Sequence, residues 1–164
     1  MRRAVRACIG LGANLGDAIA AVQGALQALD TIPGTRLLQT SRLYRTPAWG
    51  KTDQPAFVNA AALVDTTLDA RELLDHMLSI ERDFGRDRAG GERWSARTLD
   101  LDLLLYGNEV IDEPGLHVPH PHLHERAFAL VPMVEVAPDA IIPGRGRASD
   151  LVAAMVTGDI HPLG

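Results

Sequence analysis

The chain has few of the features that mark secreted or membrane-bound proteins. Its 164 residues include one cysteine, Cys8, so no disulfide can form within the chain. No apolar run approaches the length of a membrane span. Glycines from Gly10 onward interrupt the apolar residues near the start too early for a signal peptide. These absences lead us to expect a cytoplasmic protein with no membrane partner.

The common nucleotide-binding motifs are also absent. No Gly-x-x-x-x-Gly-Lys-Ser/Thr phosphate loop occurs, and the single lysine, Lys51, lies in a proline-rich stretch. The spacing of Gly10, Gly12 and Gly16 departs by one residue from the dinucleotide-binding fingerprint. If ATP binds to this chain, it therefore binds in neither of these two modes.

The chain is acidic overall, but positive charge is concentrated in one place. The formal net charge of −5 argues against binding to nucleic acids or anionic membranes. Four arginines nevertheless fall within one short glycine-containing stretch, at Arg86, Arg88, Arg93 and Arg97. Guanidinium groups match the geometry of phosphate oxygens, so the cluster suggests a confined phosphate site. A mobile arginine-rich surface loop is the plainer alternative.

Length and pattern indicate one domain over residues 1–164 and an α+β fold. The chain is 46% hydrophobic and 23% charged, as in ordinary globular proteins. Expected strands and helices are mixed without strict alternation, which favours α+β over a doubly wound sheet. We expect strands over 5–11, 35–44, 57–64, 98–106 and 110–111, and an irregular path over 114–124. We expect helices over 17–29, 69–85 and 125–136, and a last short helix capped by Ser149 or Asp150.

The sharpest chemical signal is the stretch Thr98-Leu99-Asp100-Leu101-Asp102-Leu103. On a strand, alternate side chains face opposite ways, so the leucines enter a core while Asp100 and Asp102 share the other face. Their α-carbons then lie roughly 7 Å apart. Such paired carboxylates suit Mg²⁺, which usually shares them with substrate phosphates. A solvated strand face paired with arginines is the alternative, but the neighbouring arginine cluster favours phosphoryl transfer.

Aromatic and amide side chains form a second candidate site. A flat heteroaromatic ring could stack on Trp49, Phe57 or Phe128, and Asn59 could donate to and accept from a ring edge. Taken one at a time, each aromatic is more simply explained as a core residue.

A third pattern is the run of histidines at His117, His120, His122 and His124. Clustered histidines suggest zinc, and a zinc-dependent hydrolase is the main alternative function. Pro119 and Pro121 hold the chain extended, however, so these side chains need not converge. A phosphate contact by His120 explains that residue at least as well. A non-catalytic ligand-binding α+β module is the other alternative.

Several segments, taken together and in their order along the chain, resemble the 6-hydroxymethyl-7,8-dihydropterin pyrophosphokinases of folate biosynthesis. The most specific is Glu92-Arg93-Trp94-Ser95-Ala96-Arg97-Thr98-Leu99-Asp100-Leu101-Asp102. The others are 9–16, 41–47, 53–55, 59–61, 118–121 and 126–128. The resemblance implies a ferredoxin-like α+β sandwich, with a mainly antiparallel sheet flanked by helices. It also implies transfer of diphosphate from ATP to the pterin hydroxymethyl group, with release of AMP.

The resemblance also implies roles for individual residues. Asp100 and Asp102 would hold two Mg²⁺ ions, and Arg86 and Arg97 would contact the transferring phosphates. The ATP-side positions are Arg88, Arg93, Trp94, Leu103, His120 and Arg126. The pterin-side positions are Thr46, Pro47, Trp49, Phe57, Asn59 and Phe128. The expected partners are thus two small molecules, and nothing in the sequence predicts a protein partner.

Overall fold

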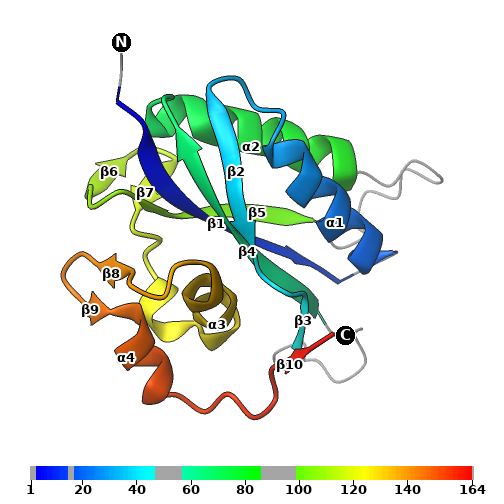
Figure 1. Ribbon diagram of the computed structural model, residues 1–164, viewed down its shortest axis with the longest axis vertical. Helices are drawn as coiled ribbons and strands as arrows, with labels where there is room; N and C mark the ends of the chain where they lie inside the picture. Colours follow the sequence, from blue (N-terminus) through cyan, green and yellow to red (C-terminus); the bar gives the residue numbers. More distant parts are fainter. Residues whose placement is uncertain (1–2, 15–16, 47–56, 86–98, 164) are drawn as a thin grey trace.

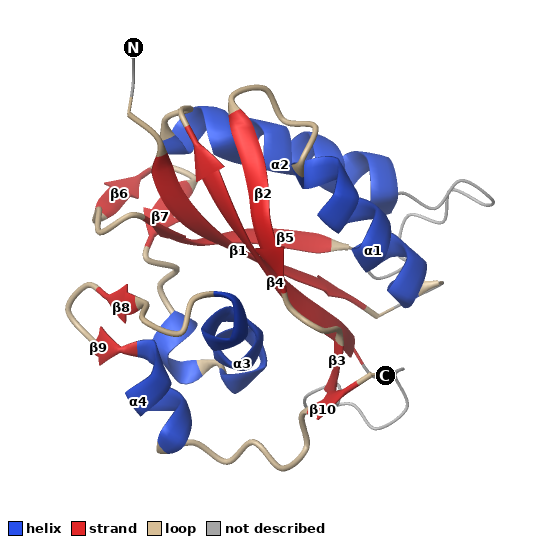
Figure 2. Cartoon of the chain, viewed as in Figure 1, coloured by secondary structure: helices blue, strands red, loops and turns tan. Residues whose placement is uncertain are grey.

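A computed structural model describes residues 3–14, 17–46, 57–85 and 99–163. An antiparallel sheet lies between two layers of helices (Figures 1 and 2). Its strands run in the order β10-β3-β4-β1-β5, and β2 also pairs with β4. The strands are β1 (Val5–Ala13), β2 (Thr35–Thr40), β3 (Tyr44–Thr46), β4 (Phe57–Thr66), β5 (Asp100–Tyr106) and β10 (His161–Pro162). This α+β arrangement confirms the expected fold class.

The first face of the sheet is covered by α1 (Ala18–Leu29) and α2 (Ala70–Gly85), at the top of Figure 1. Each helix begins with a local capping interaction. Asp17 caps α1 by accepting from the N–H of Ala20 at 3.0 Å. Asp69 and Glu72 form a capping box before α2, with reciprocal bonds of 2.8 and 3.0 Å.

The alternation of side chains along the strands builds the core beneath these helices. Ile9 and Leu11 of β1 and Leu101 and Leu103 of β5 point into it, with Leu73 and Met77 from α2. These residues are buried because every second strand position faces the same way. The sequence pattern is therefore sufficient to place this core.

The second face carries the 3₁₀ helix η1 (Leu123–Glu125), α3 (Ala127–Val136) and α4 (Ala148–Ala153). A second core lies here, formed around Cys8, Leu63, Leu130 and Met133. It covers only part of the face, and the rest is left for the cavity described below. Two small ribbons complete the fold, β6 (Ile111–Glu113) with β7 (Leu116–Val118), and β8 (Ile141–Ile142) with β9 (Gly146–Arg147).

Three sequence-based predictions were wrong in detail. The single strand expected over 35–44 is two strands, because the chain leaves the ladder between Thr40 and Tyr44. The segment 114–124 is not irregular throughout, since it contains β7. Arg147 occupies the N-cap position of the last helix without a side-chain cap bond, so Ser149 and Asp150 lie inside the helix.

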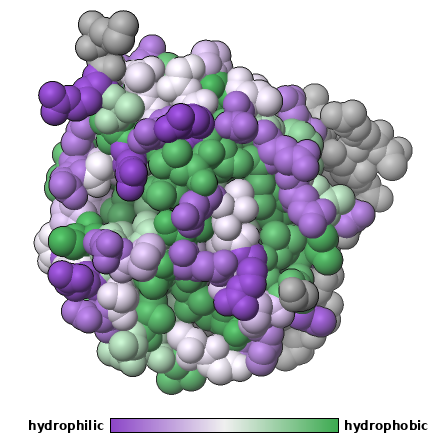
Figure 3. Space-filling view, in the orientation of Figure 1, coloured by the Kyte–Doolittle hydropathy of each residue, from purple (hydrophilic) through white to green (hydrophobic). Residues whose placement is uncertain are grey.

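Two further observations concern the surface. No helix among the described residues is long and apolar enough to span a bilayer. Across the face seen in Figure 3, hydrophobic residues extend over much of the middle, and hydrophilic residues surround and interrupt them.

Candidate active site

A cavity of about 560 Å³ opens on the second face of the sheet, beside the start of α3. Strands β1, β3, β4 and β5 form its floor and one wall, and α3 forms another. The side chains expected to carry chemistry meet there. They are the polar residues Thr46, Asn59, Asp100, Asp102 and Arg126 and the aromatic residues Phe57 and Phe128.

The aspartate pair has the predicted geometry. Asp100 and Asp102 are exposed on β5, while Leu101 between them is buried. Their partners on β1 are Gly12 and Gly10, so no neighbouring β1 side chain covers the carboxylates. Both aspartates therefore line the cavity, on the face where a metal-binding role would place them.

An additional carboxylate holds this strand from the other side. Strand β5 lies at the edge of the sheet, and the N–H of Leu101 donates to Glu81 Oε2 of α2 at 2.8 Å. An unpaired edge N–H is thus satisfied by a side chain rather than by another strand. Sequence reasoning missed Glu81, because this contact joins positions 20 residues apart across two elements.

Two glycines make room for the cavity floor. A Cβ atom on Gly12 would lie 2.7 Å from Asn59 Oδ1, which is too close for an unshifted side chain. A Cβ atom on Gly10 would lie 3.2 Å from a methyl carbon of Leu104. The sequence predicted a first strand over 5–11, but β1 continues to Ala13 and both glycines lie within the strand.

Asn59 lies where the pterin-edge contact was predicted. It is 7% exposed, and its Nδ2 donates to Thr46 Oγ1 at 2.7 Å. Because this bond uses one amide hydrogen, the remaining N–H and the carbonyl oxygen can still pair with a ligand. Asn59 and Thr46 thus form one fixed polar edge of the cavity.

The aromatic residues contribute to the same cavity. Phe57 lies on β4 opposite Thr46, and Phe128 lies in the first turn of α3. Both are only partly buried, so the alternative that they are core residues does not hold for either. The Arg126 guanidinium lies 5.7 Å from the centre of the Phe128 ring, a cation–π contact that places positive charge at the cavity wall.

His120 is half-buried near the aspartate pair. Its N–H donates to the carbonyl of Leu104 at 3.1 Å, which fixes the backbone beside β5. Burial lowers the pKa of His120; Asp102 opposes this shift, and the positive charges of Arg126 and His122 add to it. The neutral imidazole is therefore favoured near neutral pH, so His120 is better suited to donate a hydrogen bond than to supply positive charge.

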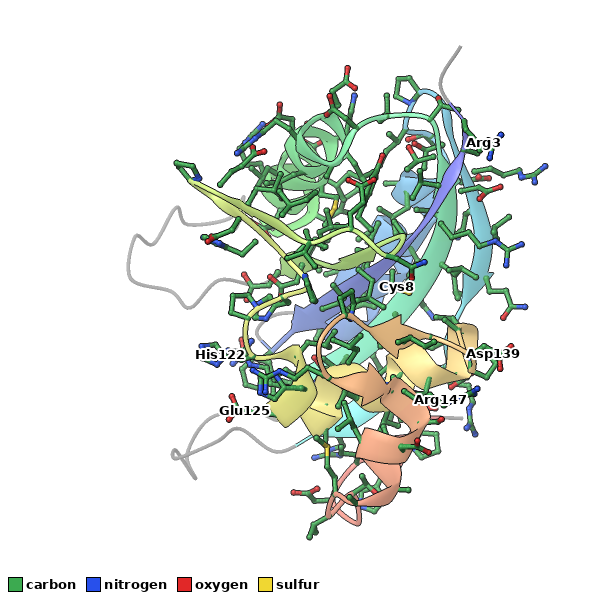
Figure 4. The ribbon with its side chains drawn as sticks, turned by 90° about the vertical axis from the view of Figure 1, so that its left-hand side faces the viewer. Arg3, Cys8, His122, Glu125, Asp139 and Arg147 are labelled. Carbon is green, nitrogen blue, oxygen red and sulfur yellow. The ribbon has the colours of Figure 1, made fainter. Side chains whose placement is uncertain are left out.

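His122 is a neighbour of His120, with the two ring centroids 6.4 Å apart. His117 pairs with Asp112 at 2.7 Å, and His122 pairs with Glu125 at 3.2 Å (Figure 4). Within the described ranges, no group of three His, Cys, Asp or Glu side chains is arranged to hold a metal ion. The histidine run thus gives no support to a zinc-dependent hydrolase.

Leu103 does not share the cavity with the other predicted ATP-side residues. It is 5% exposed and faces the core under α1 and α2. Leu104, the next residue, faces the other side of the sheet and lines the cavity, and the register with β1 shifts at this residue. A nucleotide contact by Leu103 stays a prediction, and such a contact would involve its main chain.

Seven predicted site residues lie outside the described residues, and their roles stay predictions. They are Pro47, Trp49, Arg86, Arg88, Arg93, Trp94 and Arg97. Their segments adjoin the described site in sequence: residue 47 follows Thr46, which lines the cavity, and residue 98 precedes Leu99 and Asp100.

Comparisons with known proteins identify the family of this chain. Residues 8–138 match the 7,8-dihydro-6-hydroxymethylpterin-pyrophosphokinase family (HPPK). A Methylorubrum extorquens protein named 2-amino-4-hydroxy-6-hydroxymethyldihydropteridine pyrophosphokinase is 46% identical over 139 residues, covering 85% of this chain and 87% of its own. The protein of that name from Pseudomonas aeruginosa is 44% identical over 149 residues, covering 91% of each chain.

Among solved structures, a Plasmodium falciparum HPPK-DHPS chain superposes with a TM-score of 0.73. The match covers 93% of this chain and 44% of the Plasmodium chain, at 15% sequence identity. At that identity the likeness shows the fold alone. The sequence matches extend over most of the chain, and they show that it belongs to the 7,8-dihydro-6-hydroxymethylpterin-pyrophosphokinase family.

Proposed function

We propose that this chain transfers diphosphate from ATP to 6-hydroxymethyl-7,8-dihydropterin, giving the pterin diphosphate and AMP in folate biosynthesis. One observation carries the proposal beyond family membership. A single cavity contains paired aspartates for a metal–phosphate group and, beside them, an amide and two aromatic rings for a flat heterocycle. A simple binding module for a flat heterocycle would have no need of the paired aspartates, and a simple metal site would have no need of the aromatic residues.

The pterin half of the site is formed by residues from β3, β4 and α3. Phe57 and Phe128 offer apolar surface for a flat ring, and Asn59 and Thr46 offer polar groups at its edge. A pterin ring has both donors and acceptors along one edge, which suits an amide side chain. Trp49 and Pro47 would add to this half from the neighbouring segment.

The ATP half is formed around Asp100 and Asp102. The chemistry of this donor set fits Mg²⁺, because two carboxylates supply hard oxygens and leave positions for water and phosphate oxygens. We propose that the pair holds two Mg²⁺ ions, as the resemblance implies. When bound, Mg²⁺ neutralises charge on the phosphates of ATP. His120, Arg126 and the main chain of Leu103 would contact the nucleotide, together with Arg88, Arg93 and Trp94.

The residues of the chain then act mainly by positioning. The pterin hydroxymethyl oxygen attacks the β-phosphorus of ATP, the bond from that phosphorus to the α-phosphate oxygen breaks, and AMP leaves. The hydroxyl proton is released to solvent. Asn59, Thr46 and the aromatic walls hold the hydroxymethyl group in line, and Arg86 and Arg97 would stabilise the charge on the transferring phosphates. No covalent intermediate is required.

We further propose that residues 1–164 form one domain that acts in the cytoplasm on these two small molecules. Both hydrophobic cores pack against the same sheet, which supports one folding unit.

A product assay tests the function. The purified protein is incubated with ATP, Mg²⁺ and 6-hydroxymethyl-7,8-dihydropterin, and AMP is separated from ADP by chromatography. The proposal predicts AMP in amounts equal to the pterin diphosphate, and none when the pterin is left out. Formation of ADP would indicate an ordinary kinase, and no consumption of ATP by folded protein would indicate a binding module.

A further inference from the structure

A group of three side chains joins β3 to α3 outside the cavity. Tyr44 donates its hydroxyl hydrogen to Glu135 Oε1, and the main-chain N–H of Arg42 donates to Glu135 Oε2 at 3.0 Å. The Arg42 side chain adds an ion pair with Glu135 at 3.5 Å and a bond to the Tyr44 hydroxyl at 3.3 Å. Glu135 thus joins two segments about 90 residues apart, and we call this group the Arg42–Tyr44–Glu135 cluster.

The cluster lies where the expected long strand breaks. Ser41 replaces part of the missing ladder, because its hydroxyl accepts from the N–H of Ala61 and donates to the carbonyl of Arg42. After this break, β3 resumes with Tyr44 opposite Asn59. Residues that are opposite each other in a ladder face the same side, so Tyr44 faces α3 together with the cavity residue Asn59.

Glu135 lies on the same side of α3 as Phe128, which lines the cavity. Phe128 and Glu135 are seven residues apart in α3, which is about two helical turns, so they point in similar directions. Pro132 lies between them and has no N–H, so the carbonyl of Phe128 lacks its usual helical donor. With that bond missing, the orientation of the first turn depends more on contacts that hold the helix to the sheet.

On β3, the cluster lies next to Thr46, which also lines the cavity. Tyr44 is two residues before Thr46, which accepts the bond from Asn59 and lines the cavity. The strand β3 has only three residues, so its own ladder is short. The cluster therefore fastens together two elements that each contribute a residue to the cavity lining, Phe128 from α3 and Thr46 from β3.

The chemistry of the cluster suits a rigid contact. Glu135 loses solvation by burial, but the hydrogen bonds from Tyr44 and the Arg42 main chain outweigh this and lower its pKa. The carboxylate is therefore ionised at neutral pH, and bonds to a charged acceptor are stronger than neutral ones. The Arg42 side chain is exposed, and exposed ion pairs contribute little, so Tyr44 and the main-chain N–H carry most of the contact.

We propose that Arg42, Tyr44 and Glu135 are positioning residues that set the width of the pterin pocket by holding α3 against β3. The inference rests on the proposed function of the cavity. It assigns the cluster a specific effect, because loosening this contact should weaken pterin binding more than nucleotide binding. Of the described residues assigned to ATP, only Arg126 adjoins α3. The paired aspartates are held by β5 and Glu81, which the cluster does not touch.

The test is the affinity of the full chain for 6-hydroxymethylpterin, followed by quenching of the pterin fluorescence. Tyr44→Phe removes only the hydroxyl, and Glu135→Gln removes the charge at nearly constant size. We expect each change to raise the pterin Kd roughly 5- to 30-fold, the range of one buried hydrogen bond. The Kd for a non-hydrolysable ATP analogue with Mg²⁺ should rise by a smaller factor than the pterin Kd.

Tyr106→Phe is the matched control. Tyr106 is equally buried, faces the first core, and its hydroxyl donates to the carbonyl of Leu68, far from the cavity. Its removal should lower the unfolding midpoint without changing the pterin Kd. Because Tyr44→Phe should change both quantities, the pair separates positioning from stability alone. All affinities are measured well below the unfolding midpoint of each variant.

Asn59→Ala separates failure of this inference from failure of the function. If wild type binds the pterin and Asn59→Ala does not, but Tyr44→Phe and Glu135→Gln bind as wild type does, the positioning role is wrong and the proposed function stands. If wild type does not bind the pterin either alone or with Mg²⁺ and the ATP analogue, both are wrong. A rise in the pterin Kd for Tyr44→Phe but not for Tyr106→Phe supports the inference.

Discussion

The two faces of the central sheet use the same strands for different purposes. Facing α1 and α2, alternate residues such as Ile9, Leu11 and Leu101 form a continuous apolar core. On the other face, the residues between them include Gly10, Gly12 and the two aspartates. A one-residue step along β1 or β5 therefore moves from the core to the cavity.

This difference shows how the fold accommodates a charged site. Asp100 and Asp102 repel each other and bury no apolar surface, so they add little to stability. The leucines on either side hold the strand, and Glu81 satisfies its edge. We infer that the first face supplies most of the stability and the second face most of the activity.

The largest expected effect is on the rate, from Asp102→Asn. This change keeps the size of the side chain but removes the charge that would bind the metal. We expect kcat to fall by roughly a thousandfold or more, since electrostatic groups at the reacting phosphates contribute on this scale. The free energy of unfolding should change by no more than about 0.5 kcal/mol, because the residue is exposed. Rate is followed by AMP formation and stability by urea unfolding. A large loss of stability in this variant would contradict the inference that the cavity face contributes little to stability.

The neighbouring residue should behave in the opposite way. Leu101→Ala removes a side chain that is 4% exposed in the first core. The free energy of unfolding should fall by about 2–5 kcal/mol, the usual range for a buried leucine. At low temperature the folded fraction should keep most of its rate. Leu103→Ala, in the same core, should lower the free energy of unfolding in the same way. If both variants had the unfolding midpoint of wild type, this face would not be the stabilising one.

A smaller effect is expected at the cavity floor, from Gly12→Ala. The new methyl group would lie 2.7 Å from Asn59 Oδ1, so Asn59 must turn away and its bond to Thr46 weakens. We expect the KM for the pterin to rise roughly 5- to 30-fold, as for loss of one buried hydrogen bond. Gly10→Ala meets only a flexible methyl end of Leu104 at 3.2 Å and should change KM less. Equal KM values for both variants and wild type would argue against Asn59 as a pterin contact.

The smallest effect concerns pH and the second core. Burial raises the pKa of the Cys8 thiol to about 12, above its ordinary value of 9.0. Between these values the unfolded chain releases the proton and the folded chain retains it, so the thiol lowers the unfolding free energy as pH rises from 9. The stability advantage of wild type over Cys8→Ala should therefore shrink between pH 8 and pH 10.5, measured by urea unfolding. Native protein should also resist thiol reagents at pH 8, and rapid labelling would show that this core opens.

Sequence reasoning was most successful where local pattern decides the structure. Strand alternation placed Leu99, Leu101 and Leu103 opposite the two aspartates, and burial of the leucines confirms it. Capping by Asp69 and Glu72 was also predictable, because it involves residues three apart.

It failed where contacts between distant residues decide. The extra residue at Leu104 shifts the register with β1, and no local signal in the leucine run marks it. The break after Thr40 depends on Ser41 bonding to Ala61 of another strand. Glu81 and Glu135 were missed for the same reason, since each acts on a strand that is remote in sequence. In the helical sequence patterns of their segments, neither residue differs from an ordinary exposed glutamate.

The most direct test of the division between the faces is metal binding at the aspartate pair. Mn²⁺ is titrated in the presence of a non-hydrolysable ATP analogue, and bound metal is followed by electron paramagnetic resonance. The account predicts that wild type and Leu101→Ala bind Mn²⁺ with the nucleotide, whereas Asp100→Asn/Asp102→Asn, although folded, does not. Equal Mn²⁺ binding by the folded double variant and wild type would contradict the account.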